Sequence, residues 1–368
     1  MNDWYYINNT ETIDTPALVF YPSRMEENIL LLKSMIKDTS LLRPHIKTHK
    51  SIEATLMMMK HGIFKFKCAT IAEAEMLGSC LAPDVLLAYQ PVGPKISRFI
   101  NLIKRYPSTK YSCLVDNFDS AAAISSAGLS ERIVIPVYID LNVGMGRTGI
   151  KPELKAVELF ELCSLLYGIL PLGFHFYDGH IRQLNIKDRE KQCKSILLKI
   201  KKLQLSLQKE AVKPVVIGGG SPTFPIYAKL NDIECSPGTF ILWDAGYQKS
   251  LPEQRFLPAA VVLTRVISIP EKGRICVDLG YKSIASENAL QNRVRFLNAP
   301  DLRIISHSEE HMVLESKISH KWKVGDLLYG LPVHICPTCA LYEKALISNK
   351  GEINESWKIV ARDRKITI

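Results

Sequence analysis

Several features that define common protein classes are missing from this chain of 368 residues. It contains no uninterrupted apolar run of about 18 residues, the length that a membrane-spanning helix needs. The stretch up to Thr15 is polar and aromatic, and it lacks the cationic start and apolar run of a signal peptide. The nine cysteines follow no disulfide-framework spacing, which fits reduced and mostly buried thiols. We therefore expect a soluble, cytoplasmic protein without a membrane partner.

Acidic residues are too few to balance the basic ones: Lys and Arg number 47 against 37 Asp and Glu, a formal net charge of +10. Such an excess fits nucleic acid, an anionic membrane or acidic small molecules, and the total does not choose among them. Many surplus lysines lie in a helical pattern over 187–213, interleaved with leucine and isoleucine. We interpret this helix as a solvated face over the core rather than a nucleic-acid arm, and expect no nucleic-acid partner.

Short strand-like runs alternate with longer helical patterns through the first two-thirds of the chain. Strands are expected at 16–21, 41–46, 64–68, 84–89, 110–115, 133–139, 171–176, 215–217 and 239–243. Helical spacing recurs at 23–36, 71–80, 96–104, 153–166 and 187–208. A repeat of roughly 25–30 residues over about eight units favours a closed (β/α)8 TIM-type barrel over an open sheet. Nine runs exceed eight positions, so we leave 16–21 outside the barrel.

The pattern changes after about Tyr247. Strand-like runs separated by turn signals are expected at 261–268, 274–277, 302–306, 311–315, 326–329 and 357–361. Helical periodicity is largely absent there, which predicts an antiparallel β domain after the barrel. The expected fold class is therefore α/β, a (β/α)8 TIM-type barrel followed by an antiparallel β domain.

The segment 43–50 holds the densest group of chemically active side chains. Side chains alternate along a strand, so Arg43, His45 and Lys47 are expected on one face, which in a barrel can be the interior. Three cationic groups there need an anionic ligand or partners. A lysine desolvated beside other cations also acquires the lowered pKa that a Schiff-base-forming amine needs. The alternative interpretation is an exposed basic edge strand.

A glycine-rich turn follows the expected strand at 215–217. Gly218, Gly219 and Gly220 precede the hydroxyl residues Ser221 and Thr223. Close backbone approach and hydroxyl donors are typical of a phosphate cradle, and barrels of this kind bind phosphate after their last strands. The segment matches neither a Gly-x-Gly-x-x-Gly motif nor a Walker loop. Combined with a candidate Schiff-base lysine, it suggests pyridoxal 5′-phosphate.

A third candidate site lies near the end of the chain. His334 and Cys336 are two residues apart, so on a strand they point the same way, and imidazole with thiolate is a zinc-type ligand pair. Two protein ligands leave a metal open to substrate and water. Cys336 and Cys339 also form a C-x-x-C pair, which has little support as a redox site here. A buried histidine and a buried cysteine are the alternative.

Polar residues also end two other expected strands. His175, Tyr177 and His180 can supply ring-stacking or acid–base groups, and Arg147 can pair with an anionic oxygen. Each of them, taken singly, is more often structural than catalytic. The sequence does not assign the acid–base role among these residues and His311.

Taken together, these stretches resemble the family of D-threonine aldolases and D-serine dehydratases, which have an alanine-racemase-type barrel. The resemblance is carried in family order by the segments 43–50, 177–180, 218–223, 236–239, 308–311 and 334–336. It implies a fold-type III pyridoxal phosphate enzyme whose cofactor-binding barrel spans 23–246. Residues 1–22 plus 247–368 would then form the β domain that carries the metal site. Family members are commonly head-to-tail homodimers with shared active sites.

The resemblance also implies roles for individual residues. Lys47 would be the Schiff-base lysine, with His45 and His180 as further catalytic candidates. His334 and Cys336 would bind a divalent metal, zinc or manganese. The other cofactor-binding candidates are Arg147, Tyr177, Gly219, Gly220, Thr223, Ser236 and Gly238.

The implied activity is a lyase reaction on small D-3-hydroxy amino acids, and its outcome stays open. Retro-aldol cleavage gives glycine and an aldehyde, whereas dehydration leads to a 2-oxo acid and ammonia. Cys336 is typical of the zinc-dependent dehydratases, while the segment 235–239 is typical of a bacterial subgroup grouped with the aldolases. An amino-acid racemase is the alternative, although Ser236 stands where racemases carry an arginine. A non-enzymatic pyridoxal phosphate carrier is a third hypothesis.

Overall fold

The computed structural model describes residues 3–207, 213–316 and 322–368, and the chain divides into two compact units. The first, here called the sheet unit, comprises Met1–Leu31, Thr48–Glu53 and Thr239–Arg362. The second, here called the barrel unit, comprises Leu32–Lys47, Ala54–Gly238 and Asp363–Ile368.

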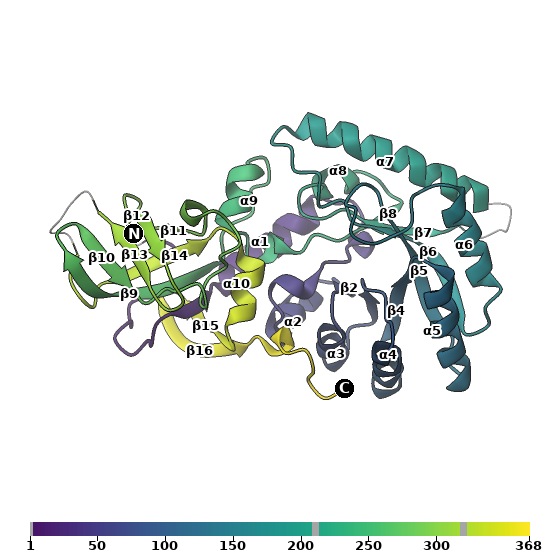
Figure 1. Ribbon diagram of the computed structural model, residues 1–368, viewed down its shortest axis with the longest axis horizontal. Helices are drawn as coiled ribbons and strands as arrows, with labels where there is room; N and C mark the ends of the chain where they lie inside the picture. Colours follow the sequence, from purple (N-terminus) through teal and green to yellow (C-terminus); the bar gives the residue numbers. More distant parts are fainter. Residues whose placement is uncertain (1–2, 208–212, 317–321) are drawn as a thin grey trace. The chain divides into compact units, whose positions relative to one another are not determined.

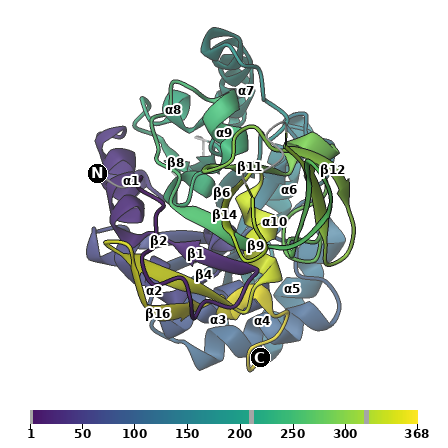
Figure 2. The same ribbon diagram turned by 90° about the vertical axis from the view of Figure 1, so that its left-hand side faces the viewer.

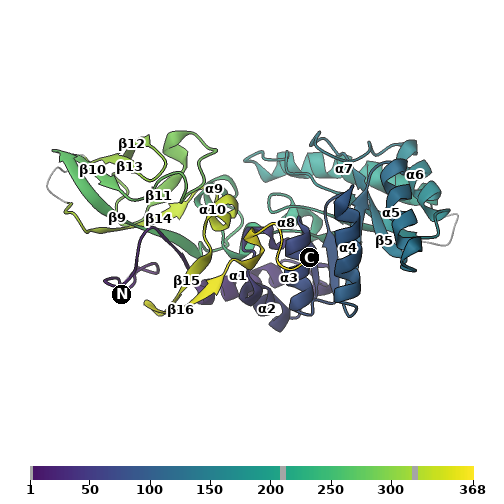
Figure 3. The ribbon, with the colours of Figure 1, turned by 60° about the horizontal axis from the view of Figure 1, so that its bottom comes forward.

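The barrel unit is a parallel sheet whose strands follow one another in chain order (Figure 1). These strands are β2 (Lys65–Cys68), β3 (Asp84–Leu87), β4 (Lys110–Val115), β5 (Ile135–Leu141), β6 (Ile169–Phe176), β7 (Val215–Gly218) and β8 (Ile233–Cys235). Helices cover the outside of the sheet (Figures 1 and 3). They are α2 (Ile52–Lys60), α3 (Ile71–Ser79), α4 (Pro94–Arg105), α5 (Phe118–Ser130), α6 (Leu154–Ser164), α7 (Ile186–Leu207) and α8 (Phe224–Tyr227).

The segment 42–45 completes the ring between β8 and β2. The N–H of Arg43 donates to the carbonyl of Cys235 at 2.8 Å, and the N–H of Lys67 donates to the carbonyl of Pro44 at 2.9 Å. Isolated parallel bridges join the segment to both neighbouring strands. Seven strands and this segment therefore close a barrel, which confirms the expected fold class.

Two of the expected barrel strands are wrong. The segment 41–46 forms only isolated bridges, because Pro44 has no N–H to donate and the chain then turns into the 3-10 helix η2 (Ile46–Thr48). The 3-10 helix η4 (Thr239–Ile241) lies where a strand is expected at 239–243. The strand is instead β8, whose three residues have the charged Glu234 at their centre and so lack an apolar run.

The predicted helices of the barrel are present with small shifts at their ends. Thr70 caps α3 by accepting the N–H of Glu73, and Asn117 caps α5, which is not among the predicted helices, by accepting the N–H of Ser120. The helix expected over 187–208 corresponds to α7, and residues 208–212 of the basic pattern lie outside the described residues. Inside the barrel, an apolar cluster is formed by Leu86, Leu114, Tyr138 and Ile217.

The sheet unit, of which Figure 2 labels strands β1, β9, β14 and β16 among others, is a mixed rather than a purely antiparallel sheet. Strand β1 (Ala17–Phe20) pairs parallel to β15 (Lys344–Asn349) and antiparallel to β9 (Ala260–Glu271), so the run at 16–21 belongs to this sheet. The remaining pairs are antiparallel. Their strands are β10 (Arg274–Val277), β11 (Val294–Phe296), β12 (Arg303–His307), β13 (Met312–Glu315), β14 (Leu327–Pro332) and β16 (Glu352–Lys358).

Some elements of the sheet unit differ from the sequence pattern. The pattern does not predict β11 or β15, and at 357–361 it predicts a strand where β16 ends and the 3-10 helix η6 (Val360–Arg362) begins. Three helices also belong largely to this unit, namely α1 (Pro22–Ser34), α9 (Ala245–Ser250) and α10 (Ile335–Leu341).

Two whole-chain expectations can be compared with the described residues. No helix among them has the length and apolar character needed to cross a membrane. All nine cysteines are free thiols, and only Cys276 and Cys336 are not fully buried. The structure therefore agrees with the expectation that the cysteines are reduced and mostly buried.

Candidate active site

Lys47 lies in the middle of η2, directly after the segment that closes the barrel. The Nδ1 atom of His45 accepts the N–H of Lys47 at 3.2 Å, which holds the turn. The N–H of His45 in turn donates to the carbonyl of Pro237 at 3.0 Å, the residue before Gly238. Because the chain turns here, strand alternation ends before Lys47.

Arg43 is a structural cation, which corrects the expectation that it shares a ligand-binding strand face with Lys47. Its Nε donates to Glu234 Oε2 and its Nη1 to Asp84 Oδ1, both at 2.6 Å. Burial alone would lower the pKa of this guanidinium, but the bonds to Asp84 and Glu234 raise it above its usual value. Asp84 is the first residue of β3, so Arg43 is held toward the amino-terminal ends of the strands.

Lys47 lines a cavity of about 700 Å³ at the carboxyl ends of the barrel strands, where barrel enzymes place their active sites. Lys67, on β2, lines the same cavity and is 4% exposed. Burial first, and then the charge of Lys47, lower the pKa of Lys67 to about 7. Other functional side chains in the lining are His45, Gln90, Arg147, His175, Tyr177 and Arg364.

Tyr177, directly after β6, joins the cavity to the glycine turn. The Nζ of Lys47 lies 5.4 Å from the centroid of its ring, and the Cζ of Arg147 lies 5.0 Å from it. Two cations within this distance suit the negative face of an aromatic ring. A Cβ atom at Gly220 would lie 3.4 Å from Cε2 of the same ring, so the ring also adjoins the turn after β7.

His175 and Asp140 form a buried pair on the neighbouring strands β6 and β5, with His175 Nδ1 2.7 Å from Asp140 Oδ1. Burial, followed by the charge of Lys67, lowers the pKa of His175 to about 4. Burial raises the pKa of Asp140, but the bond and the charge of His175 outweigh it and lower that pKa. At neutral pH Nδ1–H therefore donates to an ionised Asp140. The Nε2 atom is left as a buried acceptor without a partner among the described residues.

The expected phosphate cradle is a tight turn after β7. Gly219 has a φ of +73°, and a Cβ atom there would lie 2.7 Å from Cδ2 of Tyr227, so glycine is required. The N–H of Ser236 donates to the carbonyls of Gly218 and Gly219 at 3.0 and 3.1 Å. The Oγ of Ser236 is buried without a hydrogen-bond partner among the described residues. A buried hydroxyl of this kind would be satisfied by a ligand or by an ordered water.

Asp178 stabilises the same turn, since its Oδ1 accepts the N–H of Gly220 at 3.3 Å. Burial raises the pKa of this carboxyl. Thr223 closes the turn by donating from Oγ1 to the carbonyl of Gly220 at 3.4 Å. His180 lies two residues after Asp178, and its Nδ1 is buried without a partner among the described residues.

In the sheet unit, His334 and Cys336 lie at the start of α10, not on a strand as the spacing predicts. His334 is the N-cap residue, and Cys336 is in the first turn. The Sγ of Cys336 lies 3.1 Å from the Oγ1 of Thr48 and 3.5 Å from that of Thr239. The helical turn brings the two side chains together in place of strand alternation.

His334 interacts with two side chains. One is Cys336, and the other is Glu287, whose Oε1 is bonded to His334 Nδ1. Burial would lower the pKa of this imidazole, but Cys336 and then Glu287 raise it to about 9. A carboxylate on one ring nitrogen orients a histidine so that the other nitrogen faces a metal. Across residues 3–207, 213–316 and 322–368 no group of three His, Cys, Asp or Glu side chains could hold a metal, so this pair stands alone. Cys339 is buried, and burial raises the pKa of its thiol, which disfavours a redox pair.

The sequence patterns do not point to Lys67, Gln90, Asp140 or Arg364, which lie in the cavity lining or next to it. Lys67 could have been found, because a lysine on an alternating strand of a barrel has to face either the interior or the helices. Asp140 lies in an apolar run and gave a weaker signal of the same kind. Arg364 gave no such signal in the sequence. It lines the cavity because the segment 363–368, distant along the chain, belongs to the barrel unit.

Comparison with protein families adds a second line of evidence. The model described as alanine racemase, N-terminal domain matches residues 22–242, more than half of the chain, and a serine dehydratase domain matches residues 259–348. The chain belongs to the D-threonine aldolase and D-serine dehydratase family of alanine-racemase-type enzymes. The relatives that match along most of the chain are named aldolases and dehydratases.

Several members of this family match the chain along most of its length. A 3-hydroxy-D-aspartate aldolase from Paracoccus denitrificans (strain Pd 1222) is 25% identical, with 96% of this chain and 93% of that protein covered. A D-threonine aldolase from Arthrobacter sp. is 24% identical, with 95% and 93% covered. The crystal structure of D-threonine aldolase from Filomicrobium marinum aligns with a TM-score of 0.85 at 24% identity, covering 95% of each chain.

Proposed function

We propose that this chain cleaves or dehydrates small D-3-hydroxy amino acids with the help of pyridoxal 5′-phosphate and a divalent metal, zinc or manganese. The observation that carries the proposal is Lys47 in a cation-rich cavity at the carboxyl ends of the barrel strands. The names of the relatives, aldolases and dehydratases of D-3-hydroxy amino acids, support the substrate class.

The barrel unit has features that fit a phosphorylated aromatic cofactor. At Gly220 the nearest atoms to a Cβ position lie 3.4 and 3.8 Å away, which leaves the backbone open to close approach, and the buried Oγ of Ser236 lacks a partner among the described residues. Tyr177 lies between this turn and Lys47, and the free Nε2 of His175 is a second unsatisfied polar atom of the cavity lining. Pyridoxal phosphate, when bound, delocalises the charge that develops at the substrate Cα.

Individual residues of this chain would then bind the ligands, transfer protons or hold the site in place. Lys47 would hold the cofactor and exchange the proton at Cα, since it is the amine that the turn at η2 presents to the cavity. Arg147 would bind an anionic oxygen next to Tyr177. His180 would accept the proton of the β-hydroxyl in the aldolase branch. His45 would keep the turn in place through its bond to the N–H of Lys47.

The pair of His334 and Cys336 fits a divalent metal through the chemistry of its donors, with Glu287 orienting the imidazole. Such an ion supplies Lewis acidity toward a substrate hydroxyl. Support comes from a relative, because a variant of D-threo-3-hydroxyaspartate dehydratase has been solved in a form described as metal-free. We further propose a cytoplasmic homodimer, to be tested by sedimentation at micromolar concentration.

The decisive experiment supplies purified protein with pyridoxal phosphate and zinc or manganese, and then with D-threonine and D-serine separately. Glycine with an aldehyde identifies the aldolase branch, and a 2-oxo acid with ammonia identifies the dehydratase branch. Lys47→Ala should abolish either product, and chelation should remove activity that added metal restores. Formation of the L-isomer as the main product would favour the racemase, and turnover unchanged by chelation would contradict the metal site.

A further inference from the structure

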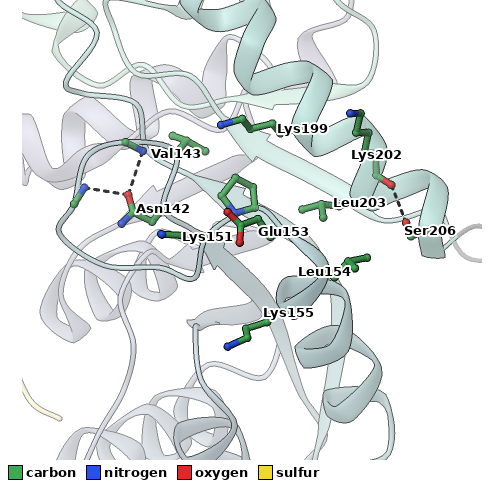
Figure 4. Close-up of a pocket in the computed structure, with 13 residues that line it drawn as sticks. Asn142, Val143, Lys151, Glu153, Leu154, Lys155, Lys199, Lys202, Leu203 and Ser206 are labelled. Carbon is green, nitrogen blue, oxygen red and sulfur yellow. Dashed lines mark hydrogen bonds between the residues drawn. The ribbon is translucent and has the colours of Figure 1, made fainter.

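A second, larger cavity of about 890 Å³ lies in the barrel unit, outside the set of residues that surround Lys47. It is bordered by the loop after β5, by the start of α6 and by one face of α7 (Figure 4). Four lysines line it, two from each side: Lys151 and Lys155 near α6, and Lys199 and Lys202 on α7. Glu153 is its one acidic lining residue.

None of these four lysines has an ion-pair partner among the described residues. Other exposed lysines of the barrel unit do have one, such as Lys229, whose Nζ lies 3.4 Å from Glu190 Oε1. Lys199 and Lys202 are three residues apart, so they lie on the same face of α7 and repel each other. A hollow bordered by unpaired cations is what an anionic ligand would neutralise.

The loop that borders this cavity also reaches the candidate active site. Gly144 lines the cavity, has a φ of +128°, and lies so close to His180 that a Cβ atom there would be 2.7 Å from Nε2. Arg147, three residues on, lies over the ring of Tyr177 and lines the cavity of Lys47. Asn142 holds the loop together by accepting the N–H groups of Gly144 and Gly146 at 3.1 and 3.0 Å.

We propose that the cavity between α6 and α7 binds a small anion with two or more negative charges, and that its occupancy is transmitted through the loop 142–149 to Arg147. Four separate ammonium groups suit a phosphate ester, pyrophosphate or polycarboxylate, because each presents a compact point charge with rotatable donors. A single carboxylate would leave most of these charges unpaired. The site is distinct from the lyase site and would make the enzyme responsive to such a metabolite.

The binding test uses the whole protein carrying bound pyridoxal phosphate, with the excess removed by gel filtration, titrated calorimetrically with pyrophosphate and, in a separate series, with citrate. The two probes distinguish a phosphate ligand from a carboxylate ligand. The variant Lys199→Gln/Lys202→Gln should weaken the preferred probe at least about tenfold, which corresponds to about 1.4 kcal/mol. The matched control Lys194→Gln/Lys201→Gln removes the same charge from the same helix outside the cavity, and should change the dissociation constant less than about twofold.

Equal weakening in both variants would reduce the effect to overall charge and overturn the site, as would the absence of saturable binding by either probe. The transmission is tested by the KM for a D-3-hydroxy amino acid with and without the bound probe. The probe should shift that KM in the wild type and in the control variant, but not in Lys199→Gln/Lys202→Gln. Binding without a KM shift would overturn the transmission, whereas absence of any turnover would count against the proposed function and leave the binding result standing.

Discussion

Two lysines line the same cavity and differ in what surrounds them. Lys67 is buried on β2, and burial together with the charge of Lys47 lowers its pKa to about 7. Lys47 instead lies in a turn that begins at Ile46 and is held by His45. An amine that is neutral near pH 7 is also a competent nucleophile, so the two lysines are the natural competitors for a carbonyl-bearing cofactor.

Substitution of Arg43 separates its structural role from the ligand role that the sequence suggests. Arg43→Met leaves Glu234 and Asp84 without their buried partner, which should cost about 3–5 kcal/mol of unfolding free energy. Urea titration measures the loss. The double variant Arg43→Met/Glu234→Gln should recover part of it, because a neutral amide needs no cation. Unchanged stability combined with weaker cofactor binding would instead support the ligand role.

The His175–Asp140 pair predicts a pH-dependent stability. The pKa of His175 is lowered to about 4 in the folded state, against about 6.5 unfolded, so below pH 6.5 the unfolded chain takes up the proton more readily. Its contribution is therefore present above pH 6.5 and is lost as the pH falls toward 4. Comparing wild type with His175→Gln, the stability cost of the substitution should shrink by about 1–2 kcal/mol between pH 7 and pH 5.

Urea midpoints at the two pH values measure that difference, and the same substitution at the exposed His311 is the control. A cost of His175→Gln that is equal at pH 7 and pH 5 would mean that His175 is protonated alike in both states. The neutral imidazole and its free Nε2 acceptor would then have to be abandoned.

The segment 363–368 is bonded to helices α3 and α4 of the barrel unit (Figure 3). The carboxylate of Glu75 on α3 is 1% exposed and accepts the N–H groups of Thr367 and Ile368 at 3.0 and 3.3 Å. Arg98 on α4 donates to the carbonyls of Ile368 and Arg364, at 2.7 and 3.1 Å from Nη2. These bonds fix the backbone of Arg364, whose side chain lines the cavity of Lys47.

Deletion of Thr367 and Ile368 should therefore destabilise the fold by about 1–3 kcal/mol, because the buried Glu75 carboxylate loses its donors. Thermal or urea unfolding measures the cost. In a Glu75→Gln background the same deletion should cost less, since no buried charge is left unpaired. An equal cost in both backgrounds would show that these bonds are not the source of the stability.

Periodicity predicted the barrel and most of its elements because amphipathic helices and apolar strands record burial directly. Periodicity failed to predict elements whose position depends on a single residue or on a contact distant along the chain. Pro44 interrupts the expected strand at 41–46, and Glu234 hides β8 because its charge is compensated by Arg43, far away in the sequence. His334 and Cys336 are expected on the same face of a strand, whereas the first turn of α10 brings the two side chains together. Contacts distant along the chain, such as those of Arg364, leave no local signal.

Some of the basic residues behind the net charge of +10 gather at two cavities of the barrel unit. One group lies at the cavity of Lys47, where Lys67, Arg147 and Arg364 also lie. Another group lines the cavity between α6 and α7 without partners among the described residues. Both cavities thus place several cations side by side, which is the arrangement that the two proposals for small anionic ligands use.

Lys47 is the residue that we expect to carry pyridoxal phosphate. Borohydride reduction of the protein with the cofactor, followed by peptide mass spectrometry, shows which lysine is labelled. We expect labelling on the peptide that contains Lys47, which is lost in Lys47→Ala and retained in Lys67→Gln. Labelling at Lys67 in the wild type, or at no specific lysine, would contradict this expectation.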